Sequence, residues 1–326
     1  MTNKKRVLSG IRATGRLHLG NYLGAVKGML DLQNNSEYET LYMVADAHTL
    51  TTPYTVEELR VNRREVIVDY LAAGLDPNKS ILFQQAQVTQ HFELAFYLSS
   101  VVTIAKMQHL PTFKDKVKQH PQHATMALLN YPILMSADIL LYKADLVPVG
   151  IDQEPHLEVS REIARSMNSK YGTDFPEPKR FATEGGYVPS LSGEGKMSKS
   201  VEGSFINLTD SIDEIRKKVR SVPTATTAGG EITGGIKTLF DFLHILAPDQ
   251  VEAFKKQFED GSLKFVELKE AVTQAIFDEL KPLQEKRSEL EKNPEYIDQI
   301  IREGAQKARA IAEETIKEVK EKVGLG

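Results

Sequence analysis

Apolar positions along the first 204 residues alternate between short runs typical of strands and the wider spacing of amphipathic helices. The strand-like runs lie at residues 6–11, 41–45, 80–83 and 146–149. The helical segments lie at residues 21–33, 55–73, 92–102, 125–142 and from about 152 onward. Thr55-Val-Glu-Glu58 forms a capping box for the second of them, and Gly74 ends it. This alternation predicts an α/β fold, a Rossmann-type, doubly wound parallel sheet with helices on both faces.

The strand pattern stops near residue 204, and the remainder is predicted to be helical. Helical spacing continues over residues 211–220, 239–246, 250–258, 264–291 and 294–322. Residues 224–235, rich in Gly and Thr, are predicted to be a loop. We therefore expect two domains: a catalytic α/β domain with a helical insertion over residues 1–204, and a smaller all-α domain over residues 205–326.

The composition is that of an ordinary globular protein, with 41% hydrophobic and 26% charged residues. No apolar run approaches the roughly 20 residues of a membrane span, and no signal peptide is evident at the N-terminus. Cysteine is absent, which excludes disulfides, thiolate metal sites and thiol catalysis. We therefore expect a cytoplasmic protein without a membrane partner.

The net charge and the histidines do not by themselves indicate a partner or a metal site. A net charge of −4 neither indicates nor excludes nucleic-acid binding, because a large enzyme can gather its Lys and Arg on one face. Among the eight histidines no HEXXH motif occurs. His120 and His123 flank a Pro-Gln pair in a polar stretch, which is interpreted as a solvated loop rather than a metal site. No protein-held metal is expected.

The first candidate site is a glycine-bearing turn after the first strand, Ser9-Gly-Ile-Arg-Ala-Thr-Gly-Arg-Leu-His-Leu-Gly-Asn-Tyr-Leu-Gly24. A helix that starts after such a turn presents free N–H groups and a positive dipole end, which suits a phosphate. Gly20 would let a ligand approach the backbone, and His18 and Asn21 offer donors. By itself the segment also fits any β-turn-α unit. The absence of GxGxxG disfavours a dinucleotide enzyme.

The second candidate site is a pair of lysines three residues apart in Gly193-Glu-Gly-Lys-Met-Ser-Lys-Ser200. Such a pair can act as a mobile cationic clamp on a leaving group whose negative charge grows during reaction. It is not a Walker A loop, because Met197 follows Lys196 and Ser190 stands where that motif requires glycine. Taken alone, the segment also fits a basic surface loop.

The third candidate site is a carboxylate on an apolar helix, in Asn130-Tyr-Pro-Ile-Leu-Met-Ser-Ala-Asp-Ile-Leu-Leu-Tyr142. Tyr131, Met135 and Asp138 share one helix face by their i, i+4, i+7 spacing. The helix is apolar nearly all round, which predicts burial, so Asp138 needs a hydrogen-bond donor. The donor is either a protein side chain or a ligand, and the sequence leaves both open.

Together these segments resemble the class I aminoacyl-tRNA synthetases, and among them the bacterial tryptophan enzymes. His18-Leu-Gly-Asn21 is similar to the HIGH motif with asparagine in the last position, and Lys196-Met-Ser-Lys-Ser200 matches KMSKS. The third segment resembles the YPxxMxAD pocket helix of the tryptophan enzymes, where the tyrosine enzymes have glutamine in place of Met135. Residues 10–15, His48 and residues 145–153 extend the likeness. It covers essentially the whole chain, most strongly to about residue 204.

The resemblance implies a two-step reaction without a covalent protein nucleophile. The carboxylate of L-tryptophan attacks the α-phosphate of ATP and expels pyrophosphate, and the 3′ end of tRNA(Trp) then takes the tryptophanyl group. Catalysis would consist of positioning and charge stabilisation, with Mg²⁺ bound through ATP. Members of this family are homodimers whose helical C-terminal domain reads the anticodon. The alternatives are a tyrosine substrate, which Met135 disfavours, and a non-charging paralogue that binds tryptophan, ATP or RNA, which the intact motifs disfavour.

The resemblance also assigns roles to residues. His18, Asn21 and Lys114 would contact ATP phosphates, and Lys196 and Lys199 the departing pyrophosphate. The residues implied around ATP are Arg12, Ala13, Thr14, Gly20, Asn21, Gly150, Ile151, Asp152, Val188, Lys196, Met197, Ser198, Lys199 and Ser200. Those implied around tryptophan are Leu8, His48, Tyr131, Met135, Asp138, Val147, Val149 and Gln153. Tyr131 and Gln153 would hold the α-amino group, and Asp138 the indole N–H.

One position departs from the family pattern. Many bacterial members have Gln-Pro where this chain has Arg12-Ala13. An arginine there could bridge the tryptophan carboxylate and the α-phosphate, or it could point outward and have no role.

Overall fold

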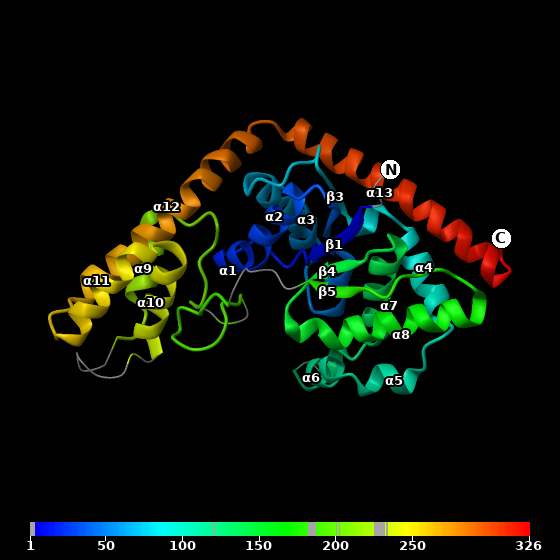
Figure 1. The fold of residues 1–326 in the computed structure, drawn as a ribbon, viewed down its shortest axis with the longest axis horizontal. Coiled ribbons are helices and arrows are strands. Elements are labelled where there is room, and N and C mark those ends of the chain that lie inside the picture. Colours follow the sequence, from blue (N-terminus) through cyan, green and yellow to red (C-terminus); the bar gives the residue numbers. More distant parts are fainter. Residues whose placement is uncertain are drawn as a thin grey trace.

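A five-stranded parallel sheet forms the centre of the molecule (Figure 1). The structure, a computed structural model, describes residues 4–119, 121–181, 187–199, 201, 203–224, 232 and 234–326. The strands are β1 (Lys5–Ile11), β2 (Tyr38–Val44), β3 (Ser80–Gln84), β4 (Leu146–Pro148) and β5 (Lys179–Phe181). Their order is β3-β2-β1-β4-β5, and every neighbouring pair is parallel. The predicted Rossmann-type sheet is confirmed.

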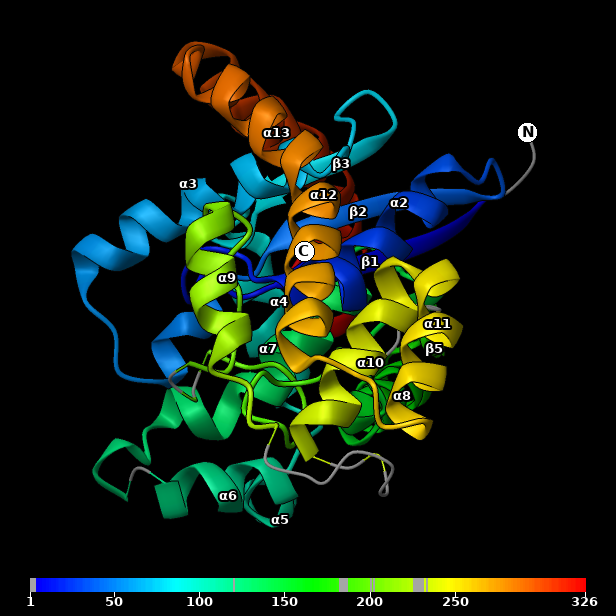
Figure 2. The same cartoon turned by 90° about the vertical axis from the view of Figure 1, so that its left-hand side faces the viewer.

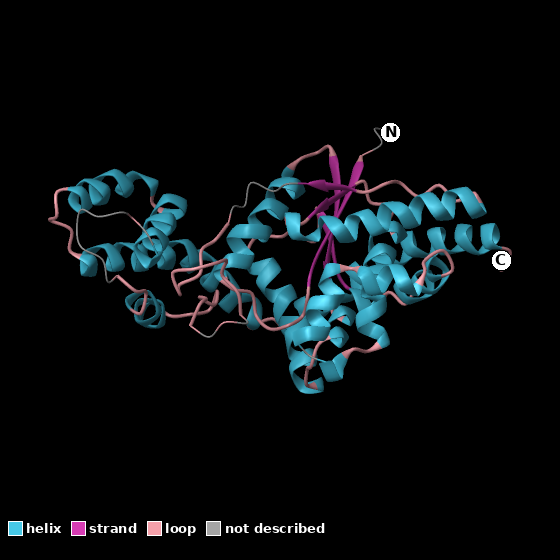
Figure 3. Cartoon of the chain, turned by 90° about the horizontal axis from the view of Figure 1, so that it is seen from below, coloured by secondary structure: helices cyan, strands magenta, loops and turns pink. Residues whose placement is uncertain are grey.

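The sheet is buried on both faces because successive side chains enter two different apolar cores. In β2, Leu41 and Met43 pack with α4 (Gln90–Ser99), α7 (Met126–Leu141) and α8 (Glu154–Tyr171). The alternate residues Tyr42 and Val44 pack with α2 (Lys27–Asn34) and α3 (Val56–Ala72). Figure 3 shows the strands edge-on between these helices. A continuous apolar run without polar alternation, as in residues 41–45, is typical of a strand that is buried on both faces.

The helix predicted over residues 21–33 consists of three consecutive pieces. α1 (Leu19–Asn21) is followed by a π-helical turn at Tyr22–Val26 and then by α2. Short π-helical turns within helices are rare and occur frequently at functional sites. Here the turn begins within the glycine-bearing segment, residues 9–24, that was singled out in the sequence.

Apart from short 3₁₀ turns, the described elements that were not predicted are α5 (Ile104–His109), α6 (Pro111–Gln119) and β5. All are short, and none of the described side chains of α6 is buried. Each is too short for its few apolar positions to identify it in the sequence. The helix predicted over residues 92–102 lies slightly earlier, at Gln90–Ser99.

The C-terminal helices form a lobe beside the sheet and then return to it (Figures 1 and 2). The lobe contains α9 (Ile212–Arg220), α10 (Gly234–Leu246), α11 (Pro248–Glu259) and the first part of α12 (Phe265–Glu291). Of the loop predicted over residues 224–235, residues 225–231 and 233 lie outside the described residues, and α10 already begins at Gly234. Within the described ranges, no helix is both long enough and apolar enough to cross a membrane.

The last helix, α13 (Pro294–Val323), packs along the sheet unit rather than within the lobe. Ala308, Ala312 and Ile316 enter the same core as α4 and α7. Gly304 lies against the backbone carbonyl of Leu82, where a Cβ atom would clash, so only glycine allows this approach to β3. The helix thereby covers the edge strand of the sheet. The domain boundary at residue 204 stays a prediction, and α13 packs across it.

Candidate active site

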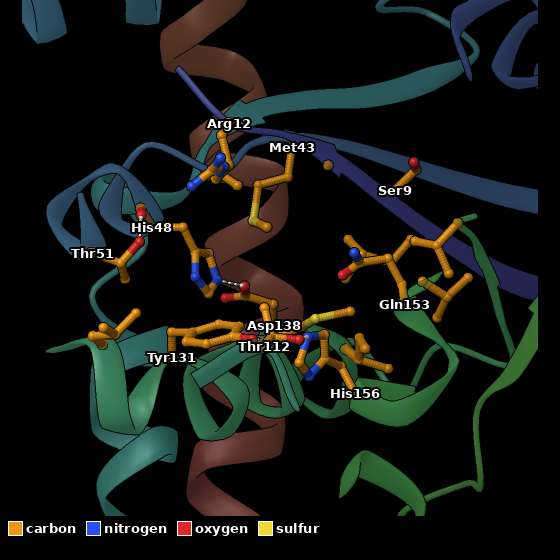
Figure 4. A pocket seen from close by; sticks show the side chains of 18 of the residues that line it. Ser9, Arg12, Met43, His48, Thr51, Thr112, Tyr131, Asp138, Gln153 and His156 are labelled. Carbon is orange, nitrogen blue, oxygen red and sulfur yellow. Dashed lines mark hydrogen bonds and ion pairs between the residues drawn. The ribbon is translucent and has the colours of Figure 1, made fainter. Parts of the chain in front are cut away.

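A cavity of about 390 Å³ opens at the carboxyl end of the sheet (Figure 4). The strand order reverses between β1 and β4, and ligands of open α/β sheets bind in the crevice at this switch point. The volume is within the range of small-molecule sites. The lining residues are Leu8, Ser9, Gly10, Arg12, Met43, Ala45, His48, Thr51, Thr112, Lys116, Leu128, Tyr131, Met135, Asp138, Ile139, Val147, Val149, Gln153 and His156.

The structure brings together at this cavity every residue that the sequence analysis assigned to tryptophan. These residues are Leu8, His48, Tyr131, Met135, Asp138, Val147, Val149 and Gln153. Arg12, assigned to ATP, lines the same cavity. Lys116, and not Lys114, is among the described lining residues, although both lie on α6. The sequence analysis did not assign Lys116, because it did not predict α6 and took Lys114 from the family resemblance.

Asp138 lies at the base of the cavity and accepts hydrogen bonds from three side chains. His91 Nδ1 and Gln85 Nε2 each lie 2.7 Å from Oδ1, and His48 Nε2 lies 2.8 Å from Oδ2. Burial raises the pKa of Asp138, but the hydrogen bonds from His48 and His91 more than offset it, so its net pKa is lowered. The protein itself therefore supplies donors to this buried carboxylate, and one edge of it still faces the cavity.

The polar end of the cavity is formed by Tyr131 and His156. The Tyr131 hydroxyl lies 2.8 Å from His156 Nε2, and Thr112 Oγ1 lies 3.1 Å from the same nitrogen. Burial lowers the pKa of His156 and raises that of Tyr131, so both are neutral near pH 7. His156 was also missed, although it follows Gln153 by three residues at the start of α8 and so shares its face.

His18 forms the N-cap of α1 in a reciprocal capping box. Its Nδ1 accepts from the backbone N–H of Asn21 at 3.2 Å, and Asn21 Oδ1 accepts from the backbone N–H of His18 at 3.2 Å. Burial, together with Lys199 and Lys196, lowers the pKa of His18 to about 4. The ring is therefore neutral at pH 7, with the proton on Nε2 because Nδ1 is an acceptor.

The lysine-bearing segment lies directly against this turn. The sulfur of Met197 accepts from the backbone N–H of Gly20 at 3.2 Å, and the Met197 N–H donates to the Val188 carbonyl at 3.0 Å. Gly15 has a φ of +123°, and a Cβ atom there would lie 2.9 Å from Lys199 Nζ. The two motifs, about 180 residues apart in the chain, are thus brought together. Ser200 lies outside the described residues.

Lys199 is the more enclosed of the two lysines. Burial lowers its pKa to about 8, opposed by the charge of Asp69. Lys196 is exposed and forms an isolated β-bridge with Pro189. A half-buried cation beside a glycine turn at a helix N-terminus favours binding of an anionic group.

The remaining residues assigned to ATP lie near the turn or on the rim of the crevice. Ala13 and Val188 are buried, while Thr14, Ile151 and Asp152 are exposed. Gly150 caps the 3₁₀ turn at Ile151–Gln153, and a Cβ atom there would strike the Asp152 side chain. Ser198 is half-buried next to Met197. Their contacts with ATP stay a prediction.

A buried ion-pair network holds the turn to the neighbouring helices. Asp69 of α3 accepts from the backbone N–H of Leu17 at 2.9 Å and pairs with Arg287 of α12, which also pairs with Glu65. Burial raises the pKa of Asp69 to about 6, opposed by Arg287. The network connects Leu17, the residue before His18, to α12, whose first part lies in the C-terminal lobe.

In the part of the chain that the structure describes, no group of three or more His, Asp or Glu side chains is arranged to hold a metal ion. His120 lies outside the described residues. The interpretation of His120 and His123 as a solvated loop therefore stays a prediction.

Comparison with known proteins identifies the same family as the sequence motifs do. Residues 1–281 match the family model of class I tRNA synthetases for tryptophan and tyrosine (W and Y). A tryptophan–tRNA ligase of Chlamydia caviae is 38% identical over 98% of this chain and 95% of its own length. A Fusobacterium nucleatum ligase of the same name is 39% identical, with 98% of both chains covered. The structure of a Campylobacter jejuni tryptophanyl-tRNA synthetase complexed with ADP and tryptophan aligns with a TM-score of 0.88 and 32% identity, covering 98% of this chain and 100% of that one. This chain therefore belongs to the class I tRNA synthetases, and within them to the tryptophan–tRNA ligases.

Proposed function

We propose that this protein activates L-tryptophan with ATP to tryptophanyl-adenylate and transfers the tryptophanyl group to the 3′ end of tRNA(Trp). The observation that carries the proposal is the juxtaposition of an apolar cavity based on Asp138 with the His18 and Lys199 turn. The cavity would hold the amino acid and the turn would hold the phosphates of ATP. Because the two sites adjoin, the carboxylate of the amino acid would lie next to the α-phosphate of ATP. Effective proximity of this kind supplies a large part of the rate enhancement in such reactions.

The cavity fits an indole better than a phenol. Leu8, Val147 and Val149 form apolar walls, and the thioether of Met135 can pack on an aromatic face. Asp138 is ionised and accepts hydrogen bonds only, which suits an indole N–H but equally a phenol O–H, so the preference for indole rests on Met135, where the tyrosine enzymes have glutamine. The α-amino group would lie at Tyr131 and Gln153.

The decisive experiment compares amino acids in two assays on the purified protein. Pyrophosphate exchange should depend on tryptophan and not on tyrosine, and total tRNA should accept tryptophan alone. Pyrophosphate exchange that depends on tyrosine would indicate a tyrosine-specific enzyme instead. Tryptophan-dependent exchange without charging would indicate a non-charging paralogue.

His18 would donate its Nε2–H to an ATP phosphate, and Lys199 would meet the pyrophosphate as it leaves. Magnesium would arrive on the ATP phosphates. The neutral state of His18 makes its contribution a hydrogen bond rather than a charge, so the positive charge at this site comes from the lysines.

The two lysines of α6 provide a matched pair. We expect Lys116→Ala to lower kcat/KM for activation by about tenfold or more, because Lys116 lines the cavity and its ammonium would donate to an anionic group of the bound substrates, and losing a charged hydrogen bond costs about 1.5–3 kcal/mol. Lys114→Ala removes the same charge from the exposed face of the same helix and should lie within about twofold of wild type. Steady-state pyrophosphate exchange measures both. A larger effect at position 114 would support the assignment of Lys114 made from the sequence.

Arg12→Gln restores the residue common in bacterial members. If the guanidinium bridges the tryptophan carboxylate and the α-phosphate, the variant should lose about tenfold in apparent affinity for each ligand, and the two binding events should become less coupled. Calorimetry of each ligand, with and without a non-hydrolysable analogue of the other, measures this coupling. A coupling equal to that of wild type would show that Arg12 does not bridge the two substrates, as in the alternative in which it points outward.

We also infer that the enzyme is a homodimer that binds its tRNA through the helical lobe. Exposed apolar side chains support the dimer: Leu50, Tyr54 and Met126 next to the cavity entrance, and Phe92 and Phe96 on α4. Light scattering of the purified protein tests it, since a monomer at micromolar concentration would exclude the assembly. The cytoplasmic location stays a prediction from composition.

A further inference from the structure

Asp138 is held from behind by a chain of buried side chains that do not belong to any recognised motif. His91, at the start of α4, is fully buried and stacks on Phe83 of β3 with ring centroids 6.1 Å apart and planes 25° apart. Its Nδ1 lies 2.7 Å from Asp138 Oδ1, and its Nε2 lies 2.8 Å from the hydroxyl of Tyr142. Both nitrogens of the ring are therefore engaged.

The direction of each hydrogen bond follows from the charge of Asp138. An ionised carboxylate only accepts, so His91 Nδ1 carries the proton and donates it to Oδ1. In the neutral ring Nε2 is then the acceptor, and the Tyr142 hydroxyl donates to it. This arrangement fixes one tautomer and one ring orientation for His91.

A count of acceptor positions shows what remains for a ligand. A carboxylate offers about four lone-pair positions, two on each oxygen. His91 and Gln85 occupy both positions of Oδ1, and His48 occupies one position of Oδ2. Gln85 is itself fixed, because its Oε1 accepts from the backbone N–H of Ala47 at 3.1 Å. Among the described residues no further side chain donates to this carboxylate, so one acceptor position remains on Oδ2, the oxygen that accepts from the cavity-lining His48.

We propose that His91 is a positioning residue for substrate specificity: it fixes the carboxylate of Asp138 so that the last acceptor position of Oδ2 faces the N–H of the bound indole. The inference rests on the proposed function, because it assigns the donor to tryptophan. Without the His91 hydrogen bond, only Gln85 holds Oδ1 and only His48 holds Oδ2, so the plane of the carboxylate is held less firmly and its remaining acceptor position is less well directed at the ligand. His91 acts only through Asp138 and is itself enclosed in the core.

The lowered pKa of Asp138 supports this role. Burial alone raises the pKa of that carboxyl, and a protonated Asp138 would offer a donor where the indole also offers one. His48 and His91 together bring the pKa below its usual value, so the site presents acceptors only.

The test compares two ligands that differ only at the indole nitrogen. L-Tryptophan and L-3-(benzothiophen-3-yl)alanine have nearly the same shape, but sulfur replaces N–H in the second. Calorimetric Kd values of both are measured for wild type, His91→Phe and His91→Asn. Wild type should prefer tryptophan by roughly 10- to 100-fold, the worth of one hydrogen bond to a charged group. His91→Phe should reduce this preference to about threefold or less. His91→Asn, whose amide nitrogen takes the place of Nδ1, should keep most of it.

The outcomes separate this inference from the proposed function. Equal affinities in wild type would show that no indole N–H is recognised, which contradicts the proposed tryptophan site itself. A large preference that persists in folded His91→Phe overturns the role of His91 and leaves the function standing. Should His91→Phe fail to fold, Tyr142→Phe removes only the hydroxyl that donates to Nε2. Its preference should then fall severalfold, and a preference equal to wild type would overturn the inference.

Discussion

Lys199→Ala is expected to slow tryptophan activation by about 10²–10³ while tryptophan binding stays nearly unchanged. The Lys199 ammonium lies beside Gly15, at the turn where the leaving pyrophosphate would gather negative charge. An interaction that strengthens in the transition state appears mainly in kcat. Pyrophosphate exchange gives kcat and KM, and calorimetry gives the tryptophan Kd. A normal kcat with only a raised tryptophan KM would contradict the clamp.

Lys199→Arg is the matched control for this prediction, because it keeps a cation at the same position. Burial lowers the pKa of Lys199 to about 8, so the free wild-type enzyme loses this charge as the pH rises through 8. Its kcat/KM for activation should therefore fall on the alkaline side. The arginine variant stays charged and should lack that decline, even if its absolute rate is lower. An alkaline decline that is identical in both enzymes would assign it to another group.

Sequence patterns predicted the fold wherever burial leaves a mark on the chain. Leu41, Tyr42 and Met43 are consecutive apolar residues because the interior strand β2 is covered on both faces, and such a run identifies it. β5 has only three residues and a single apolar side chain, Phe181, and it lies at the edge of the sheet. A short edge strand needs no apolar run, so its sequence does not distinguish it from a loop.

The candidate site divides in the same way between local motifs and tertiary contacts. His18 and Asn21 form a local capping box, so their geometry was already contained in the sequence spacing. His91 meets Asp138 only because α4 packs on α7, and 47 residues separate the two in the chain. The sequence analysis left open whether a protein side chain or a ligand donates to Asp138. Contacts of this kind depend on packing, which a single sequence does not specify.

Those contacts change what replacing Asp138 should do. Because Gln85, His48 and His91 all donate to its two oxygens, the amide of Asp138→Asn must direct its NH₂ group at a donor in either orientation. Leaving a buried hydrogen-bond donor without an acceptor costs about 1–3 kcal/mol of the free energy of unfolding. We therefore expect a clear fall in Tm for a variant that still folds, which chemical denaturation can quantify.

Asp138→Asn should also recognise tryptophan less well, and its kcat/KM for tryptophan should fall by at least about 10². The asparagine carbonyl can still turn toward the indole, but the bond loses its charge, and in that orientation the NH₂ group faces the donors of His91 and Gln85. Turning the amide round returns the carbonyl to the donors of His91 and Gln85, but the NH₂ group then meets the indole N–H and the donor of His48. Exchange kinetics, normalised to the active fraction from active-site titration, separate this loss from simple instability. If kcat/KM for tryptophan were unchanged while the stability fell, Asp138 would be a buried structural carboxylate, and indole recognition would have to be sought elsewhere in the cavity.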